Sequence, residues 1–251
     1  MLHFLLGGYD LEMIEIRNLL EENNFLFSDK NLSWGASVDN YSDVILAHPL
    51  HHFVGVELAV RNPSLLPKYY IEIDHHNDKV NLPSSIEQIA TMLQIPLTRY
   101  QQLIAANDKG YIPAMRALGA TEEEISTIRH LDRKTQGVTP EMELIAIEEL
   151  NNVHYLNHDF ITLKTSLDKF SPLIDRISKK KVLIYNSKVL NYYGQGVKNL
   201  AFSFKDLIEA QKIYHGGGDN GYFGTVVGAF SESELNFLIS KIIDHVARFD
   251  S

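Results

Sequence analysis

The 251-residue sequence contains no cysteine, which excludes disulfide bonds, thiolate metal ligands and cysteine nucleophiles. It has no apolar run near the roughly 18 residues that a membrane helix requires, and its short apolar N-terminus lacks the flanks of a signal peptide. Basic residues are also scarce, with 23 Lys and Arg against 32 Asp and Glu and a net charge of −9. This balance is unsuited to duplex DNA or anionic membranes. We therefore expect a cytoplasmic protein that binds neither.

The residues that are present indicate a globular α/β protein. Hydrophobic residues make up 45% of the chain and charged residues 22%, which is typical of soluble domains. Apolar runs bounded by turn residues predict strands at residues 2–6, 24–27, 44–47, 53–58 and 70–73. Capping patterns predict helices that begin near Asp10, Ser84, Thr121 and Thr139.

This order of elements predicts the domain organisation. Strands interleaved with helices favour a mainly parallel sheet flanked by helices at the N-terminus. After a segment that is hard to classify, the strand pattern restarts and indicates a smaller C-terminal α/β domain. We expect a metal-binding domain at residues 1–152, a connector at 153–180 and a substrate-binding domain at 181–251.

Acidic and imidazole side chains follow several predicted strands. They are Asp10 and Glu12 after the first strand, Glu57 in the fourth, Asp74, His75 and His76 after the fifth, and Asp108 after the apolar segment LIAAN. The carboxyl ends of parallel strands meet at one edge of a sheet, where ligands bind. Converging carboxylates repel each other unless a cation joins them. Oxygen ligands with imidazole suit Mn²⁺ or Mg²⁺, and also admit Zn²⁺, Co²⁺ or Fe²⁺.

Each of these residues also has an ordinary explanation. Asp10 can be a helix N-cap, Glu12 a first-turn acid that favours the helix dipole, and Glu57 a surface acid on an edge strand. The two histidines can lie in a polar loop, and Asp108 can be a turn residue. The joint pattern favours a metal centre over these separate explanations.

The same residues resemble the motifs of the DHH phosphoesterases. The resemblance rests on IDHH after a strand, an acidic pair after the first strand, an acid between them and a later isolated Asp. This superfamily includes single-strand-specific exonucleases, nano-RNA and cyclic-dinucleotide phosphodiesterases, exopolyphosphatases and manganese pyrophosphatases. The C-terminal HGGGDNGYFG is similar to the GGGH signature of the accessory domain often fused to them. The resemblance thus spans nearly the whole chain.

The resemblance implies a centre of two Mn²⁺ or Mg²⁺ ions and assigns roles by position. The implied metal ligands are Asp10, Glu12, Glu57, Asp74, His75 and Asp108. Asp74 and His76 are the implied catalytic residues, and His76 would face the substrate. The implied substrate-binding residues are His215, Gly216, Gly217, Gly218 and Asp219, where glycines let backbone N–H groups approach a phosphate. A simple turn between two strands is the alternative for the glycines.

The sequence departs from the family pattern at several positions. Glutamate replaces aspartate at Glu12 and Glu57, and no histidine stands a few residues before Asp10, where the family has a ligand. Asp219 occupies the place of the accessory-motif histidine, which His215 could supply instead. These differences leave a divergent member, active or inactive, as the interpretation.

Further clusters are open to two interpretations. His48, His51 and His52 could contact a metal or substrate, or lie in a surface loop; Arg116, Arg129 and Arg133, with Asp132, could bind phosphate or form a charged helix face. Lys179, Lys180 and Lys181 are expected in a solvated linker.

The pattern as a whole predicts a metal-dependent phosphohydrolase with a nucleotide-like substrate. We expect a small phosphorylated substrate, such as a dinucleotide or short single-stranded nucleic acid, and a homodimer is compatible with the sequence. Polyphosphate or pyrophosphate hydrolysis is an alternative, as is a nucleotide-binding sensor that has lost turnover. A metal-free interaction domain is disfavoured, because it would gather the acids without a cation.

Overall fold

The computed structural model describes residues 1–33, 35–76 and 79–248 and divides into two compact units, Met1–Gly137 and Val138–Ser251. The first unit holds a four-stranded parallel sheet in the order β2-β1-β3-β4. Its strands are β1 (Leu2–Leu6), β2 (Leu26–Ser28), β3 (His52–Val56) and β4 (Tyr70–Ile73). The predicted α/β fold with an N-terminal parallel sheet is therefore confirmed.

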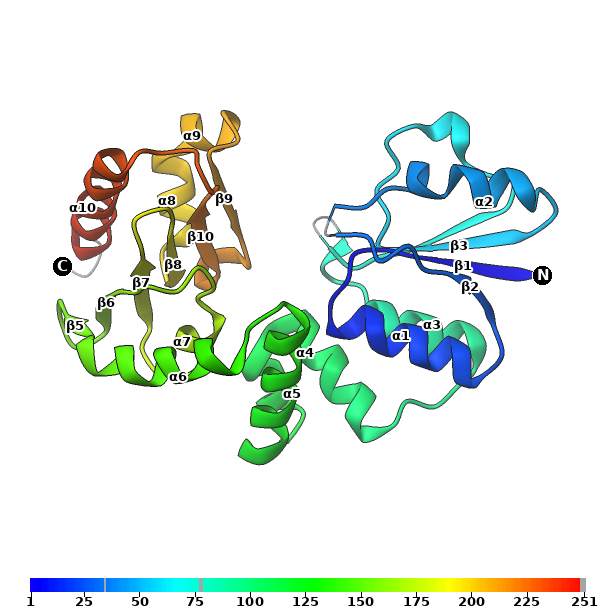
Figure 1. Cartoon of the computed structure of the whole chain (residues 1–251), viewed down its shortest axis with the longest axis horizontal. Coiled ribbons are helices and arrows are strands. Elements are labelled where there is room, and N and C mark those ends of the chain that lie inside the picture. Colours follow the sequence, from blue (N-terminus) through cyan, green and yellow to red (C-terminus); the bar gives the residue numbers. More distant parts are fainter. Residues whose placement is uncertain (34, 77–78, 249–251) are drawn as a thin grey trace. The chain divides into compact units, whose positions relative to one another are not determined.

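Helices cover both faces of this sheet (Figure 1). The helices of the unit are α1 (Leu11–Glu22), α2 (Ser42–Ala47), α3 (Ser85–Leu93), α4 (Arg99–Ala117) and α5 (Glu122–Thr135). Alternate residues of β1 face opposite sides, because side chains alternate along a strand. Phe4 and Leu6 pack in a core that includes residues of α1 and α3, and Leu5 packs with Tyr41 and Phe53 on the other side. Both faces are buried, as is usual for parallel sheets.

One predicted strand of this unit is wrong. Residues 44–47 lie in helix α2, where Ile45 is buried and Leu46 is 77% exposed. A four-residue apolar run does not distinguish a strand from one side of a short helix. Short 3₁₀ turns at Val38–Tyr41 and Pro63–Leu65 complete the connections.

The second unit contains a six-stranded mixed sheet in the order β5-β6-β7-β8-β10-β9. Its strands are β5 (His154–Tyr155), β6 (Phe160–Lys164), β7 (Lys181–Tyr185), β8 (Leu190–Gly194), β9 (Ile213–Gly216) and β10 (Tyr222–Thr225). Its helices are α6 (Pro140–Glu149), α7 (Ser171–Ile174), α8 (Val197–Ser203), α9 (Lys205–Glu209) and α10 (Glu232–Arg248), with 3₁₀ turns at Leu150–Asn152 and Gly218–Asn220. Strands β6 and β7 are parallel, and the other neighbouring pairs are antiparallel.

The structure divides the chain earlier than the expected boundary at residue 152. Ala146 of α6 packs in a buried core with Ile161 of β6 and Val182 of β7, so α6 is part of the second unit. The stretch 153–180, expected to be a connector, supplies β5, β6 and α7 to that unit. Lys181 is buried at the start of β7, and the expectation of a solvated linker there is wrong. Within the described residues, none of the helices combines the length and apolar character needed to cross a membrane.

Candidate metal centre

Four side chains of the first unit gather around the imidazole of His75. Its Nε2 atom lies 2.6 Å from Asp108 Oδ2 and 3.5 Å from both Glu12 Oε2 and Glu57 Oε1. Glu57, His75, His76 and Asp108 each offer a ligand atom, and these atoms all lie within 4.8 Å of one another. The sequence pattern thus selected residues that the fold brings together from the ends of strands and from two helices.

Three polar atoms at this point are buried without a hydrogen-bond partner among the described residues: Glu12 Oε2, His75 Nε2 and Asp108 Oδ2. The short contact between His75 and Asp108 does not have the angles of a hydrogen bond. Glu12 and His75 are only 2% and 5% exposed. Buried polar atoms without partners are rare because they are costly. A divalent cation would satisfy all three at once, so the residues present fit a bound metal ion.

The pKa values of the centre indicate that the metal-free protein holds extra protons there. Burial raises the pKa of Asp10 to about 8, and the nearby charges of Glu57 and Asp108 add to the shift. Burial likewise raises the pKa of Glu12 to about 8. Burial alone would lower the pKa of His75, but its contacts with Asp108, Glu12 and Glu57 raise it to about 12. A cation binding here must displace protons, since ligands bind in their deprotonated forms.

The stability of the metal-free protein should therefore fall as the pH rises. The pKa values of Asp10 and Glu12 are 3.8 and 4.5 when the side chains are exposed to water, and about 8 in the folded protein. Between these pH values the folded protein binds more protons than the unfolded chain, so the free energy of unfolding falls as the pH rises. Calorimetry at pH 6, 7 and 8 should show a falling Tm in chelator. Saturating Mn²⁺ should raise the Tm, and the rise should be several degrees larger at pH 8 than at pH 6. Each kcal/mol of added unfolding free energy raises the Tm by about 2–4 °C. An equal Mn²⁺-induced shift at all three pH values would contradict this assignment of the protons.

Close backbone packing brings the ends of β1 and β3 together. A Cβ atom on Gly7 would lie 2.5 Å from the carbonyl oxygen of Val56 and 2.7 Å from that of Glu57. Only glycine permits this approach, which places Asp10 and Glu12 beside the end of β3. Glu57 itself has a φ of 51°, a left-handed conformation that is uncommon for residues with a side chain. Such strain is concentrated at functional sites.

The N-terminus of α3 holds two of the carboxylates. The backbone N–H of Ile86 donates to Glu12 Oε1 at 3.1 Å, and the hydroxyl of Ser85 donates to Glu57 Oε1 at 2.7 Å. The positive end of the helix dipole also favours negative charge at this position. Sequence reasoning placed this helix from its capping box, which is present between Ser84 and Glu87, but it missed Ser85.

Replacing Ser85 by alanine should weaken metal binding through Glu57. The change removes the hydroxyl that donates to the Glu57 carboxylate while leaving the ligands themselves in place. We expect the Mn²⁺ dissociation constant to rise about 10-fold, as is usual for partners of metal ligands. Titration calorimetry would measure it. Ser37→Ala is a matched control, because Ser37 is also buried but contacts Asn40. Identical affinities in both variants would show that Ser85 does not position Glu57.

Asp108 reaches the centre from a helix, so the expectation that it follows a strand is wrong. It lies in α4 just before an interruption, where Tyr111 has φ 53° and ψ −146°. The neighbouring Asn107 accepts a hydrogen bond from Arg129 at 2.9 Å. Arg129 also pairs with Asp132 at 2.6 Å and lies 5.1 Å from the Tyr111 ring centroid. This network holds the part of α4 that carries Asp108.

Other predicted arginines have structural roles. Arg129 and Arg133 are buried, so the alternative of a solvent-exposed charged helix face is wrong for both. Arg116 pairs with Glu122 at 3.0 Å on the surface, as expected for an ordinary helix face.

The carboxylate of Asp74 binds His76 and is not part of the group formed by Glu57, His75, His76 and Asp108. Its Oδ1 atom accepts from both the backbone N–H and the Nδ1 of His76 at 3.0 Å, and Oδ2 lies 3.4 Å from Lys79 Nζ. Burial would raise the pKa of Asp74, but these bonds from His76 and the charge of Lys79 lower it on balance. The His76 side chain is 37% exposed.

Asp10 is the N-cap of α1, which confirms its ordinary explanation. Its Oδ1 atom accepts from the N–H of Met13 at 2.8 Å. Because Glu57 and Asp108 also raise its pKa, Asp10 lies beside the centre, although outside the group of four.

The predicted glycine-rich motif forms a hairpin in the second unit. His215 lies on β9, and the turn Gly218–Asn220 leads to β10. Added Cβ atoms would lie 2.5 Å from the Tyr222 hydroxyl at Gly216 and 2.8 Å from Gly221 Cα at Gly217, and Gly217 and Gly218 have positive φ. The turn between strands therefore explains these glycines, and contact with a phosphate stays a prediction.

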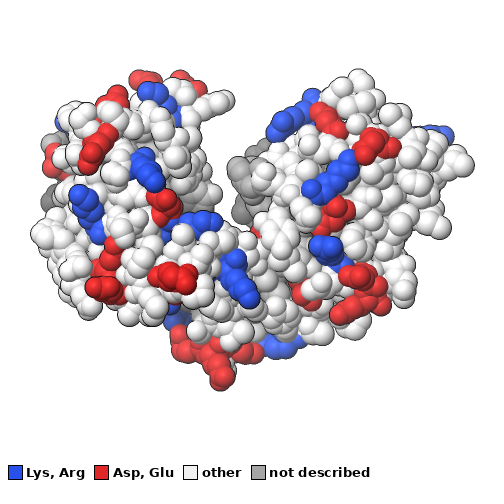
Figure 2. Space-filling view, in the orientation of Figure 1, with Lys and Arg blue, Asp and Glu red and all other residues white. Residues whose placement is uncertain are grey.

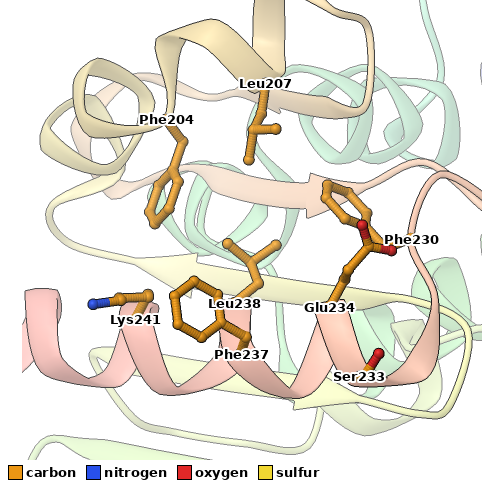
Figure 3. Close-up of a pocket in the computed structure, with 8 residues that line it drawn as sticks. All are labelled: Phe204, Leu207, Phe230, Ser233, Glu234, Phe237, Leu238 and Lys241. Carbon is orange, nitrogen blue, oxygen red and sulfur yellow. The ribbon is translucent and has the colours of Figure 1, made fainter.

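An apolar pocket of about 330 Å³ lies on the second unit between α9 and α10 (Figure 3). Its walls are mainly Phe204, Leu207, Phe230, Phe237 and Leu238, and Figure 3 shows their side chains around the space. Ser233, Glu234 and Lys241 are the polar residues of its lining, and none of them belongs to the group around His75.

Comparisons with known proteins find similarity only among solved structures. No protein-family model and no curated protein matches the chain. Its fold is similar to PggH, a pGpG-specific phosphodiesterase from Vibrio cholerae, at 10% identity and a TM-score of 0.48 over 98% of each chain. It is similar to Mn²⁺-bound RecJ from Thermus thermophilus at 10% identity and a TM-score of 0.47, over 98% of this chain and 52% of RecJ.

A structure described as a DHH domain matches at 10% identity and a TM-score of 0.45, over 94% of this chain and 73% of that one. The fold and the order of the acids are those that the resemblance to the DHH phosphoesterases implies. These similarities concern the arrangement of the chain alone.

Proposed function

We propose that this chain is a divalent-cation-dependent phosphohydrolase of the DHH type that cleaves a small, phosphate-rich substrate. The observation that carries the proposal is the convergence of Glu12, His75 and Asp108 through buried atoms that have no hydrogen-bond partner among the described residues. A buried, acid-rich site of this kind is a strong candidate for catalysis, because it is costly to the fold and useful only with a cation.

The ligands of one cation would be Glu12, Glu57, His75 and Asp108. His76 also lies within reach of this point, but its Nδ1 is bonded to Asp74, and we assign it to the substrate instead. Three carboxylates and one imidazole suit Mn²⁺ and admit Mg²⁺. The bound ion would polarise a phosphoryl oxygen and lower the pKa of a coordinated water. The expected second ion depends on Asp10 and Asp74, and it stays a prediction.

His76 is the proposed group that faces the phosphoryl centre. Its Nδ1 hydrogen bond to Asp74 fixes the ring and leaves Nε2 available to a substrate. From there His76 would stabilise charge on a phosphoryl oxygen or position the attacking water. Asp74 would act through His76, by holding its orientation.

The surface charge favours a short substrate over a long nucleic acid. Figure 2 shows Lys and Arg interspersed with Asp and Glu on the visible face of each unit, and the described residues of that face form no continuous basic track. Binding along a nucleic-acid backbone usually requires such a track. A dinucleotide or short single strand needs only a few contacts. Nucleotide binding by His215, Gly218 and Asp219 of the hairpin is a separate proposal for the second unit.

The test is a substrate panel assayed with Mn²⁺ and with chelator. The panel holds a linear dinucleotide, a short single-stranded RNA, pyrophosphate and polyphosphate. The proposal predicts Mn²⁺-dependent cleavage of the dinucleotide or the RNA. Cleavage of pyrophosphate alone would support the alternative substrate class. Bound Mn²⁺ with no cleavage of any member would contradict the proposed hydrolase.

A further inference from the structure

A second cluster of side chains that can bind a metal lies near the amino-terminal ends of the parallel strands β1 and β3, opposite the ends that the acids follow. His3 is near the start of β1, and His51 directly precedes β3, whereas the acids follow the ends of the strands. His48 follows α2, on the same connection as His51. The ring centroids are 5.4 Å apart for His3 and His51, 5.7 Å for His3 and His48, and 4.7 Å for His48 and His51.

The centroid spacings are near those of three imidazoles around a tetrahedral cation, although the nitrogens of all three rings do not converge on one point. A zinc–nitrogen bond of about 2.0–2.1 Å places ligand nitrogens about 3.3 Å apart and ring centroids about 5 Å apart. The Nδ1 atoms of His3 and His51 are 3.2 Å apart. The two rings are hydrogen-bonded to each other at this distance, which is also the separation of neighbouring ligands.

The surroundings keep His3 in the form that binds metals. Its Nε2 atom lies 2.9 Å from the hydroxyl of Ser28, an outer contact of the kind that orients metal-ligating imidazoles. His3 is buried, and burial, followed by the charges of His51 and His48, lowers its pKa to about 4. The pKa of His51 is lowered as well. Both rings are therefore neutral near pH 7.

We propose that His3, His48 and His51 form a binding site for Zn²⁺ or a similar transition-metal cation. The rings of His48 and His51 are stacked at 9°, so His48 must turn about its side-chain bonds to direct a nitrogen at the cation. His48 is exposed and has room to do so. Three nitrogens without carboxylates favour Zn²⁺, Co²⁺, Ni²⁺ or Cu²⁺ over Mn²⁺ and Mg²⁺. The site is independent of the proposed phosphohydrolase activity.

The experiment measures Zn²⁺ uptake by the full chain, without an affinity tag, in a Glu12→Gln background that removes one proposed ligand of the acidic centre. Chelator-treated protein is equilibrated with Zn²⁺, and bound zinc is counted by elemental analysis. Co²⁺ substitution then reports tetrahedral nitrogen coordination by its visible absorption. We expect the His48→Ala/His51→Ala double variant, which changes only side chains outside the fully buried core, to bind one Zn²⁺ per chain fewer than its Glu12→Gln parent. His52→Ala is the matched control, because its ring contacts Tyr69 instead.

Two results would overturn the proposal. One is equal zinc uptake by the double variant and the His52→Ala control. The other is no uptake by the Glu12→Gln protein that still carries all three histidines, provided circular dichroism shows it folded. Since Mn²⁺-dependent hydrolysis is measured separately on protein with an intact acidic centre, failure of either proposal can be recognised without the other.

Discussion

Replacing Glu12 by glutamine should reduce metal-dependent hydrolysis by about a thousandfold or more, equivalent to the several kcal/mol that a bound cation contributes. Glu12 Oε2 is one of the three buried atoms that a cation would satisfy, and an amide is a poor ligand in its place. The amide oxygen of glutamine can still accept from the N–H of Ile86, as Glu12 Oε1 does. The change therefore removes the metal contact and keeps the contact with α3.

The same substitution should leave the metal-free protein as stable or more stable at pH 8. It removes a carboxyl group whose pKa is raised to about 8 by burial and which is costly to ionise. Activity and metal-free stability thus move in opposite directions. Thermal unfolding in chelator and initial rates in Mn²⁺ would measure both.

Glu22→Gln is the matched control for this prediction. Glu22 belongs to the same helix, α1, but is exposed. We expect the activity and the Mn²⁺-induced Tm shift of the Glu22→Gln variant to equal those of the unchanged protein. If Glu12→Gln keeps full activity, or still shows the normal Mn²⁺-induced shift, then Glu12 is not a ligand and the centre is misassigned.

Replacing His76 by alanine should lower kcat by about 10²- to 10⁴-fold, the usual contribution of a positioned acid–base group. Metal affinity should change by only a few-fold, because the ring is held by Asp74 on one side and is open to solvent on the other. Steady-state kinetics and Mn²⁺ titration on the same sample separate the two effects. His158→Ala, at a histidine that is 94% exposed, is the control.

A loss of Mn²⁺ binding in His76→Ala, as large as in a Glu12 variant, would instead make His76 a metal ligand. Unchanged kcat would remove it from the catalytic machinery. Either result would contradict the proposed division of roles between His75, which contacts the three carboxylates, and His76, which is proposed to face the substrate.

The strand-end rule explains why much of the centre could be predicted from the sequence. Glu57 and His75 follow short apolar strands, and parallel pairing brings such positions together. Asp108 was selected for the wrong local reason, since α4 is a helix. Its approach to His75 depends on tertiary packing that a run of five residues does not encode. Ser85 was missed because a buried hydroxyl has no pattern in sequence.

The organisation of the second unit was harder to predict for a related reason. Phe160–Lys164 is a short strand between polar segments, and only its pairing with β7 shows that it belongs to a sheet. The position of Arg129 was also hard to predict, because its charge predicts a surface position. In the structure it is buried, and its guanidinium donates hydrogen bonds to Asp132 and Asn107. Buried partners of this kind come from different elements and cannot be paired from one sequence.

The central claim is that a cation occupies the point around which Glu12, Glu57, His75 and Asp108 converge. The most direct test is an anomalous difference map from a crystal grown with Mn²⁺, with data collected on either side of the manganese absorption edge. The account predicts a peak within bonding distance of His75 Nε2 and of carboxylate oxygens from Glu12 and Asp108. Clear density for these side chains with no manganese peak between them would contradict it.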